Sequence, residues 1–166
     1  MNANRLSVLI LALAIAATSP ALANPDCSSN ANLWHVHRRL DGAMDNLNHD
    51  THDYGGHRVA AINDLESARK ALVAAEQYAV NTDHDNPACF RASGPAGGSD
   101  AAWGTRSQLG SNANIGGVAR WVGNLVYQLN SDRRDYGGYR AAAVTDMRAA
   151  QAQLQAAQAY ARSHGY

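Results

Sequence analysis

The chain lacks the signals that usually mark an enzyme or a nucleic-acid-binding protein. It contains no GxSxG nucleophile motif, no phosphate-binding glycine loop, no HExxH and no CxxCH haem-attachment motif. Its 14 Lys and Arg residues are balanced by 14 Asp and Glu residues, so the basic surface that nucleic acids require is also missing. We therefore predict a protein with no catalytic centre and no nucleic-acid partner.

Large aromatic residues are scarce in the predicted core. There is one Phe in 166 residues, and although 46% of the chain is apolar, much of that fraction is alanine. A core built on alanine buries little area per residue and brings helix backbones close together. The composition therefore favours closely packed helices.

Long apolar runs are limited to the beginning of the chain. Residues 6–17 form such a run, which follows Arg5 and precedes the small-residue sequence ALA at 21–23. The alternatives to a signal peptide are a buried N-terminal helix or a membrane anchor. The run is too short to cross a bilayer, which argues against the anchor. We predict a cleaved signal peptide at residues 1–23, and a periplasmic or secreted mature chain with no membrane span.

Cysteine occurs twice, at Cys27 and Cys89. Two thiols in an oxidising compartment usually pair, and this pair would close a loop around the first half of the chain. Two metal-binding thiolates are the alternative, but neither cysteine has a CxxC partner. We predict a disulfide between them.

The sequence is internally repeated. Residues 53–58 read DYGGHR and residues 135–140 read DYGGYR, at an offset of 82. With that offset residues 32–84 align with 114–166 without a gap, which indicates a duplication.

Each half has the apolar spacing of two helices around a glycine pair. The first segments carry apolar residues at alternating steps of three and four: Leu33, Val36, Leu40, Ala43 and Leu47, then Ile115, Val118, Val122, Leu125 and Leu129. The second segments do the same, with alanine at every other position: Ala61, Leu65, Ala68, Leu72, Ala75 and Ala79, then Ala143, Met147, Ala150, Leu154, Ala157 and Ala161. This spacing is typical of helices packed nearly parallel or antiparallel.

We therefore predict an all-α fold in which two tandem helical hairpins form a four-helix bundle. The hairpins are expected at residues 24–80 and 114–166, joined by a linker rich in Gly, Ser, Asn and Pro at 81–113. Two hairpins that dock separately on a partner are the alternative. A left-handed glycine should end the first helix of each hairpin, and Asp53 and Asp135 are candidate caps of the second.

Histidine is concentrated near the first glycine pair. His49, His52 and His57 lie close to Asp53 in the sequence, and such a set could bind Zn, Cu or Ni at the end of the bundle. The second half has no histidine at these positions, so the hairpin itself does not require them. A metal site and an exposed polar turn are the two interpretations.

The residues that both halves share offer a second candidate site. Tyr54 and Arg58 flank the first glycine pair, and Tyr136 and Arg140 flank the second. A Tyr/Arg pair, together with His57 in the first half, can hold an anion or a carboxylate. The alternative is structural, with the tyrosine packed across the hairpin end and the arginine paired with an aspartate.

The block at residues 53–62 resembles a GGHR-x-x-A motif of small exported bacterial proteins. In those proteins the motif lies between two Ala/Leu-rich helices. That group is functionally uncharacterised, so the resemblance implies a fold and a compartment but no activity. It covers residues 33–80, and the second half departs from it at Tyr139. We predict an exported, non-enzymatic bundle that binds a protein or a small ligand, with a metal-binding protein as the alternative.

Overall fold

The protein is a bundle of α-helices. The computed structural model describes residues 25–91 and 108–165, and the signal-peptide prediction for residues 1–23 lies outside them. The helices are α1 (Pro25–Asn48), α2 (His57–Asn81), α3 (Gln108–Asn130) and α4 (Tyr139–Ser163), with a short 3-10 helix η1 (Pro87–Arg91). No strand occurs in these two ranges, so the predicted all-helical fold is confirmed. None of the helices described is long and apolar enough to cross a membrane.

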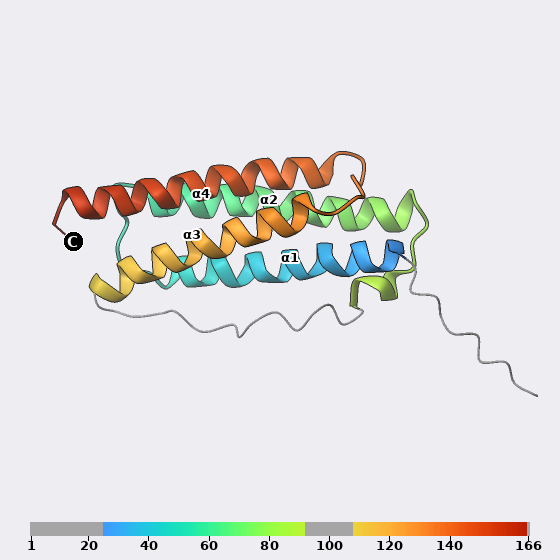
Figure 1. Cartoon of the computed structure of the whole chain (residues 1–166), viewed down its shortest axis with the longest axis horizontal. Helices are drawn as coiled ribbons and strands as arrows, with labels where there is room; N and C mark the ends of the chain where they lie inside the picture. Colours follow the sequence, from blue (N-terminus) through green and yellow to red (C-terminus); the bar gives the residue numbers. More distant parts are fainter. Residues whose placement is uncertain (1–24, 92–107, 166) are drawn as a thin grey trace, which may run out of the picture.

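Neighbouring helices of the bundle run antiparallel. α1 packs on α2 and α3, and α4 packs on the same two helices (Figure 1). The α1–α2 turn lies at the end of the bundle where α3 begins and α4 ends, which we call the first end. The α3–α4 turn lies at the opposite, second end, beside the beginning of α1 and the end of α2.

The core follows the apolar spacing of the sequence. α2 and α4 make the most extensive contact in the bundle. The predicted alanines of both helices are buried in it, from Ala61 to Ala79 on α2 and from Ala143 to Ala161 on α4. Small side chains at this interface allow the two helices to approach closely, and Leu72 and Leu154 of the same helices are fully buried. The predicted seam is confirmed.

The glycine pairs begin the second helices and do not end the first ones. α1 ends at Asn48, and the left-handed residues Tyr54, Gly55 and Gly56 come directly before α2, with φ values of 55°, 65° and 88°. Residues 136–138 repeat these angles before α4, at 52°, 66° and 90°. The expectation that glycine ends the first helix is therefore wrong, because a polar segment separates the glycine pair from α1. The predicted aspartate caps are also wrong, since the N-caps are Gly56 and Gly138 without a side-chain bond.

The segment after α2 is held against the beginning of α1. Cys27 and Cys89 form the predicted disulfide, and Phe90 beside it is buried. α3 begins at Gln108, inside the segment that the sequence assigned to the linker. Its added first turn carries Ser111, which is fully buried and contacts the α1–α2 turn.

One carboxylate on α2 gives a pH-dependent prediction. Burial, and then the nearby charge of Asp146, raise the pKa of Asp64. The charged form is therefore disfavoured in the folded state. The loss in the free energy of unfolding that it causes is absent below the unfolded pKa of about 4 and grows as the pH rises through the folded pKa. Asp64→Asn should raise the Tm at pH 7 and leave it unchanged at pH 3, as measured by thermal circular dichroism. The exposed Asp53→Asn is the control, and an equal gain from both variants would contradict the prediction.

Candidate functional site

A buried hydrogen-bond network joins the two halves at the first end. The Asp50 carboxylate is 5% exposed and accepts bonds from the Ser111 hydroxyl and, at 3.2 Å, from Asn114 Nδ2. The Tyr54 hydroxyl lies 2.6 Å from Ser111 Oγ and donates to Asn112 Oδ1 at 2.9 Å. A buried carboxylate is stable only with such partners. The turn of the first half is thus fixed by the first turns of α3.

The second end carries the same network with the halves exchanged. The Asp132 carboxylate accepts bonds from the Ser29 hydroxyl and from Asn32 Nδ2, and the Tyr136 hydroxyl shares its one hydrogen between Ser29 Oγ at 2.8 Å and Asn30 Oδ1 at 3.0 Å. Each of these residues lies 82 positions from its counterpart at the first end. Burial raises the pKa of the Tyr136 phenol and of Tyr54, so both hydroxyls remain donors at neutral pH.

Sequence reasoning missed these networks, although a signal was present. Residues 29–32 and 111–114 both read SNAN. Each of these segments starts three residues before the aligned stretch and ends on its first residue. Extending the repeat by three residues would have shown that both halves keep a serine and two asparagines there. These residue types at a helix start look like ordinary capping residues, and only the fold shows that they bond the opposite half.

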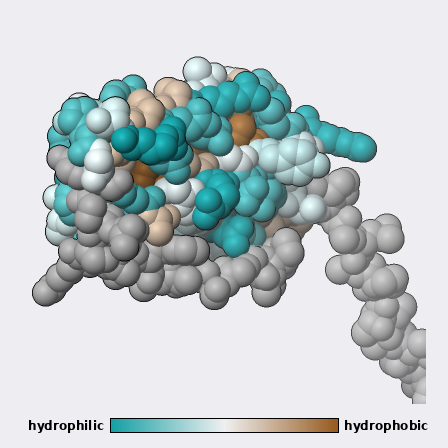
Figure 2. Space-filling view, turned by 60° about the vertical axis from the view of Figure 1, so that its left-hand side comes forward, coloured by the Kyte–Doolittle hydropathy of each residue, from teal (hydrophilic) through white to brown (hydrophobic). Residues whose placement is uncertain are grey.

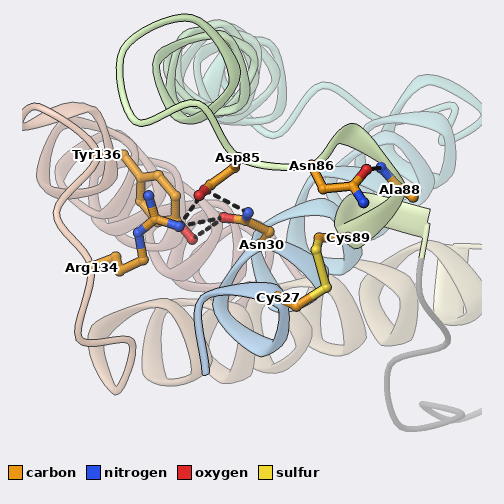
Figure 3. The surroundings of a disulfide bond; sticks show 8 residues. All are labelled: Cys27, Asn30, Asp85, Asn86, Ala88, Cys89, Arg134 and Tyr136. Carbon is orange, nitrogen blue, oxygen red and sulfur yellow. Dashed lines mark hydrogen bonds and ion pairs between the residues drawn. A yellow bond between two sulfur atoms is a disulfide. The ribbon is translucent and has the colours of Figure 1, made fainter. Parts of the chain in front are cut away.

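The two ends differ in what covers the network. At the second end, Arg134 pairs with Asp85, and its guanidinium lies 4.8 Å from the centre of the Tyr136 ring (Figure 3). Arg134 also pairs with Asp83, at 2.6 Å. Asp85 also accepts a bond of 2.7 Å from Asn30 Nδ2. The segment after α2 therefore closes the second end with an aspartate, and the disulfide holds that segment in place.

At the first end the corresponding place is a pocket. It has a volume of about 160 Å³, and its lining residues are Tyr54, Asn112, Ile115, Gln158, Ala161 and Arg162. Figure 2 turns this end of the molecule toward the viewer and shows small hydrophobic areas enclosed by hydrophilic side chains. Arg162 is exposed and has no ion-pair partner among the described residues. The pocket thus combines an apolar wall with an amide, a phenol and a positive charge.

The structure divides the predicted binding residues between the two ends. Tyr54, His57 and Arg58 belong to the first end, and Tyr136 and Arg140 belong to the second. Of these five, Tyr54 alone is among the residues that line the pocket. The hydroxyl of Tyr136 is bonded inside the network at the other end.

The two predicted arginines hold helix ends. Arg58 Nη1 donates to the Leu47 carbonyl at 2.9 Å, and Arg140 Nη1 donates to the Leu129 carbonyl at 3.1 Å. A cation at the last carbonyls of a helix satisfies acceptors that have no partner within the helix. These contacts give both arginines a structural role at the C-termini of α1 and α3.

The predicted metal ligands are not brought together. His49 Nδ1 lies 2.8 Å from the Asp45 carbonyl, His52 Nδ1 lies 3.2 Å from Ser111 Oγ, and His57 Nδ1 lies 2.9 Å from Gln153 Oε1. The fourth predicted ligand, Asp53, is exposed. In the part of the chain that the structure describes, no three His, Cys, Asp or Glu side chains are grouped to hold a metal ion. The prediction of a Zn, Cu or Ni site gains no support from this arrangement, and the alternative of metal-binding thiolates is wrong, because both cysteines are in the disulfide.

The comparisons with known proteins do not add a relative. Neither the protein-family models, nor the curated proteins, nor the solved structures include a match to this chain. The candidate site is therefore defined by its own geometry, as a partly charged pocket at the first end of an all-helical bundle.

Proposed function

We propose that this protein is an exported, non-enzymatic bundle that binds a small ligand, or a segment of another protein, in the pocket at the first end. The signal-like pattern of residues 1–23 and the disulfide between Cys27 and Cys89 support export, since disulfides persist in oxidising compartments. The duplication suggested by the repeat belongs to the same proposal. It is supported by the matching turn angles and by the matching networks at the two ends.

One observation carries the binding function. Two ends with the same buried network differ in their covering, since an aspartate lies against the network at the second end while the described residues leave a pocket at the first. The walls of the pocket are already ordered by the network behind them, because Tyr54 is fixed by Ser111 and Asn112. A preformed site requires little ordering of the protein when a ligand binds.

A fragment screen tests the proposal. The disulfide-bonded mature protein, labelled with ¹⁵N, is mixed with a library of small fragments, and the amide shifts are recorded by NMR. We expect hits that shift the amides of Ile115 and Ala161, and that are lost in Gln158→Trp, which fills the pocket. Gln155→Trp, on the exposed face of the same helix, is the matched control and should keep the hits. Hits that are absent, or that survive in Gln158→Trp, would show that the pocket does not bind ligands.

A further inference from the structure

We propose that the second end contains a carboxylate site that the chain fills with its own Asp85, and that reduction of the disulfide opens this site to an aspartate of another polypeptide. The segment of residues 82–91, which we call the strap, carries Asp85 and is joined to α1 through Cys89 (Figure 3). The site lies at the opposite end of the bundle from the pocket, so the inference goes beyond the proposed function.

The groups that hold the Asp85 carboxylate come from both halves of the chain. Asn30 of α1 is fully buried, and its Oδ1 accepts bonds from the Tyr136 hydroxyl at 3.0 Å and from Arg134 Nη1 at 3.2 Å. Because these bonds fix the oxygen of the amide, its nitrogen is directed to the strap, and Nδ2 donates to Asp85 Oδ2 at 2.7 Å. Arg134 Nη1 donates to the same carboxylate oxygen (Figure 3). A buried amide and a guanidinium therefore converge on one carboxylate.

These two donors require an acceptor whether or not the strap supplies it. A buried N–H group that loses its partner carries the full desolvation penalty, and the penalty is larger for a charged group. Another carboxylate would restore the charge-assisted bonds that Asp85 makes, so a carboxylate is the preferred replacement. The side chains of Asp85 and Arg134 are 13% and 18% exposed, so the site lies beside the surface and within reach of a second chain.

The strap is held in the site with a strained backbone. His84, directly before Asp85, has a φ of 57°, a left-handed value that residues other than glycine rarely adopt. The disulfide opposes release of the strap, because it joins Cys89 to Cys27 at the beginning of α1. Once the bond is reduced, the strain at His84 and the conformational entropy of the strap both favour release.

The opening step needs a dithiol as its co-reactant. One thiolate of the dithiol attacks a sulfur of the disulfide and forms a mixed disulfide, and its second thiol then displaces the protein sulfur from that intermediate. Two electrons and two protons pass to Cys27 and Cys89, which become thiols, while the reductant leaves as a disulfide.

The strap also shows what form of ligand the site accepts. Its occupant is an aspartate within a peptide, whose backbone N–H donates to the Ala79 carbonyl at 3.0 Å. Arg134 Nη2 donates to Asp83, two residues earlier, at 2.6 Å. An Asp-x-Asp segment of another polypeptide can make all of these bonds, whereas a free inorganic anion has no N–H to donate.

Peptide binding tests the site and its control by the disulfide. A fluorescein-labelled peptide with the sequence of residues 82–91, carrying serine in place of Cys89, is titrated with the oxidised protein and with the protein reduced by a dithiol, and anisotropy is recorded. We expect binding at least 10-fold tighter after reduction. The variant with Cys27→Ser and Cys89→Ser should match the reduced wild type without any reductant. Circular dichroism under the same conditions reports whether the helices remain.

Matched substitutions locate the binding. In the reduced protein, Arg134→Gln should weaken binding by 10-fold or more, while Arg133→Gln at the exposed neighbouring position should leave it unchanged. The peptide that carries Asp83→Asn and Asp85→Asn should also bind at least 10-fold more weakly, because it loses the charge-assisted bonds.

Several results would overturn the inference. Equal binding by the oxidised and reduced proteins would remove the role of the disulfide, and loss of the helical signal on reduction would mean that the fold melts and no site opens. Equal losses from Arg134→Gln and Arg133→Gln, or equal binding of the two peptides, would remove the carboxylate site. Competition by N-acetyl-aspartate amide as strong as that of the peptide would identify a small carboxylate as the ligand instead of a polypeptide. Each of these results leaves the fragment screen of the first-end pocket unaffected.

Discussion

Replacing both Cys27 and Cys89 with serine should lower the free energy of unfolding by about 4 kcal/mol. The disulfide joins residues separated by 62 positions, and in the chain-entropy model a closed loop of that length restricts the unfolded chain by roughly this amount. The loop contains α1 and α2 entirely apart from the first residues of α1. The loss is measured by urea unfolding of the protein, followed by circular dichroism.

The wild-type protein in reducing agent is the control for this prediction. It should unfold at the same urea concentration as the double serine variant, because both lack the same cross-link. A loss below about 1 kcal/mol would mean that the unfolded chain is already compact around this loop. The peptide segment at 83–91 should also become more accessible to protease in the variant, since the disulfide fixes it to α1.

Gly55→Ala should destabilise the protein by about 3 kcal/mol, whereas Gly56→Ala should cost only about 1 to 2 kcal/mol. Both glycines have positive φ, so any side chain carries the left-handed penalty of about 1 to 2 kcal/mol. A Cβ on Gly55 would also lie 2.6 Å from Cε2 of the Tyr160 ring, while a Cβ on Gly56 would meet nothing within 4 Å. The difference between the two variants therefore measures the close approach of the turn to α4.

A second substitution separates the clash from the backbone strain. Removing the ring with Tyr160→Ala should reduce the cost of Gly55→Ala to that of Gly56→Ala, and this is measured as a double-mutant cycle in urea. Gly137 makes the same approach to the Tyr78 ring at the second end, so Gly137→Ala and Gly138→Ala should reproduce the pattern. Equal costs at Gly55 and Gly56 would contradict the explanation.

The sequence predicted the parts of the fold that depend on local periodicity. The apolar spacing located the seam from Ala61 to Ala79 and its counterpart on α4, because a helix places every third or fourth residue on one face. The disulfide was also predictable, since the chain has only two cysteines. The sequence did not show which helix the glycine pair adjoins, because a positive φ is equally suited to the end of one helix and to the residues directly before the next.

The candidate site could not be predicted in the same way. Asn112 and Arg162 lie on different helices, and the pocket exists only because α3 begins and α4 ends beside the α1–α2 turn. The histidines were a misleading signal, because proximity in sequence near a turn does not direct imidazoles to one point. His49, His52 and His57 instead have three different partners.

The exchange of bonds between the halves has a consequence for how the molecule holds together. Asp50 takes its side-chain donors from α3, and Asp132 takes its side-chain donors from α1, so neither hairpin contains the side chains that donate to its own aspartate. A hairpin on its own would expose its seam and leave its aspartate without side-chain donors. Each half donates side-chain hydrogen bonds to the aspartate of the other half. This is the self-complementary contact of a symmetric dimer, here made within a single chain.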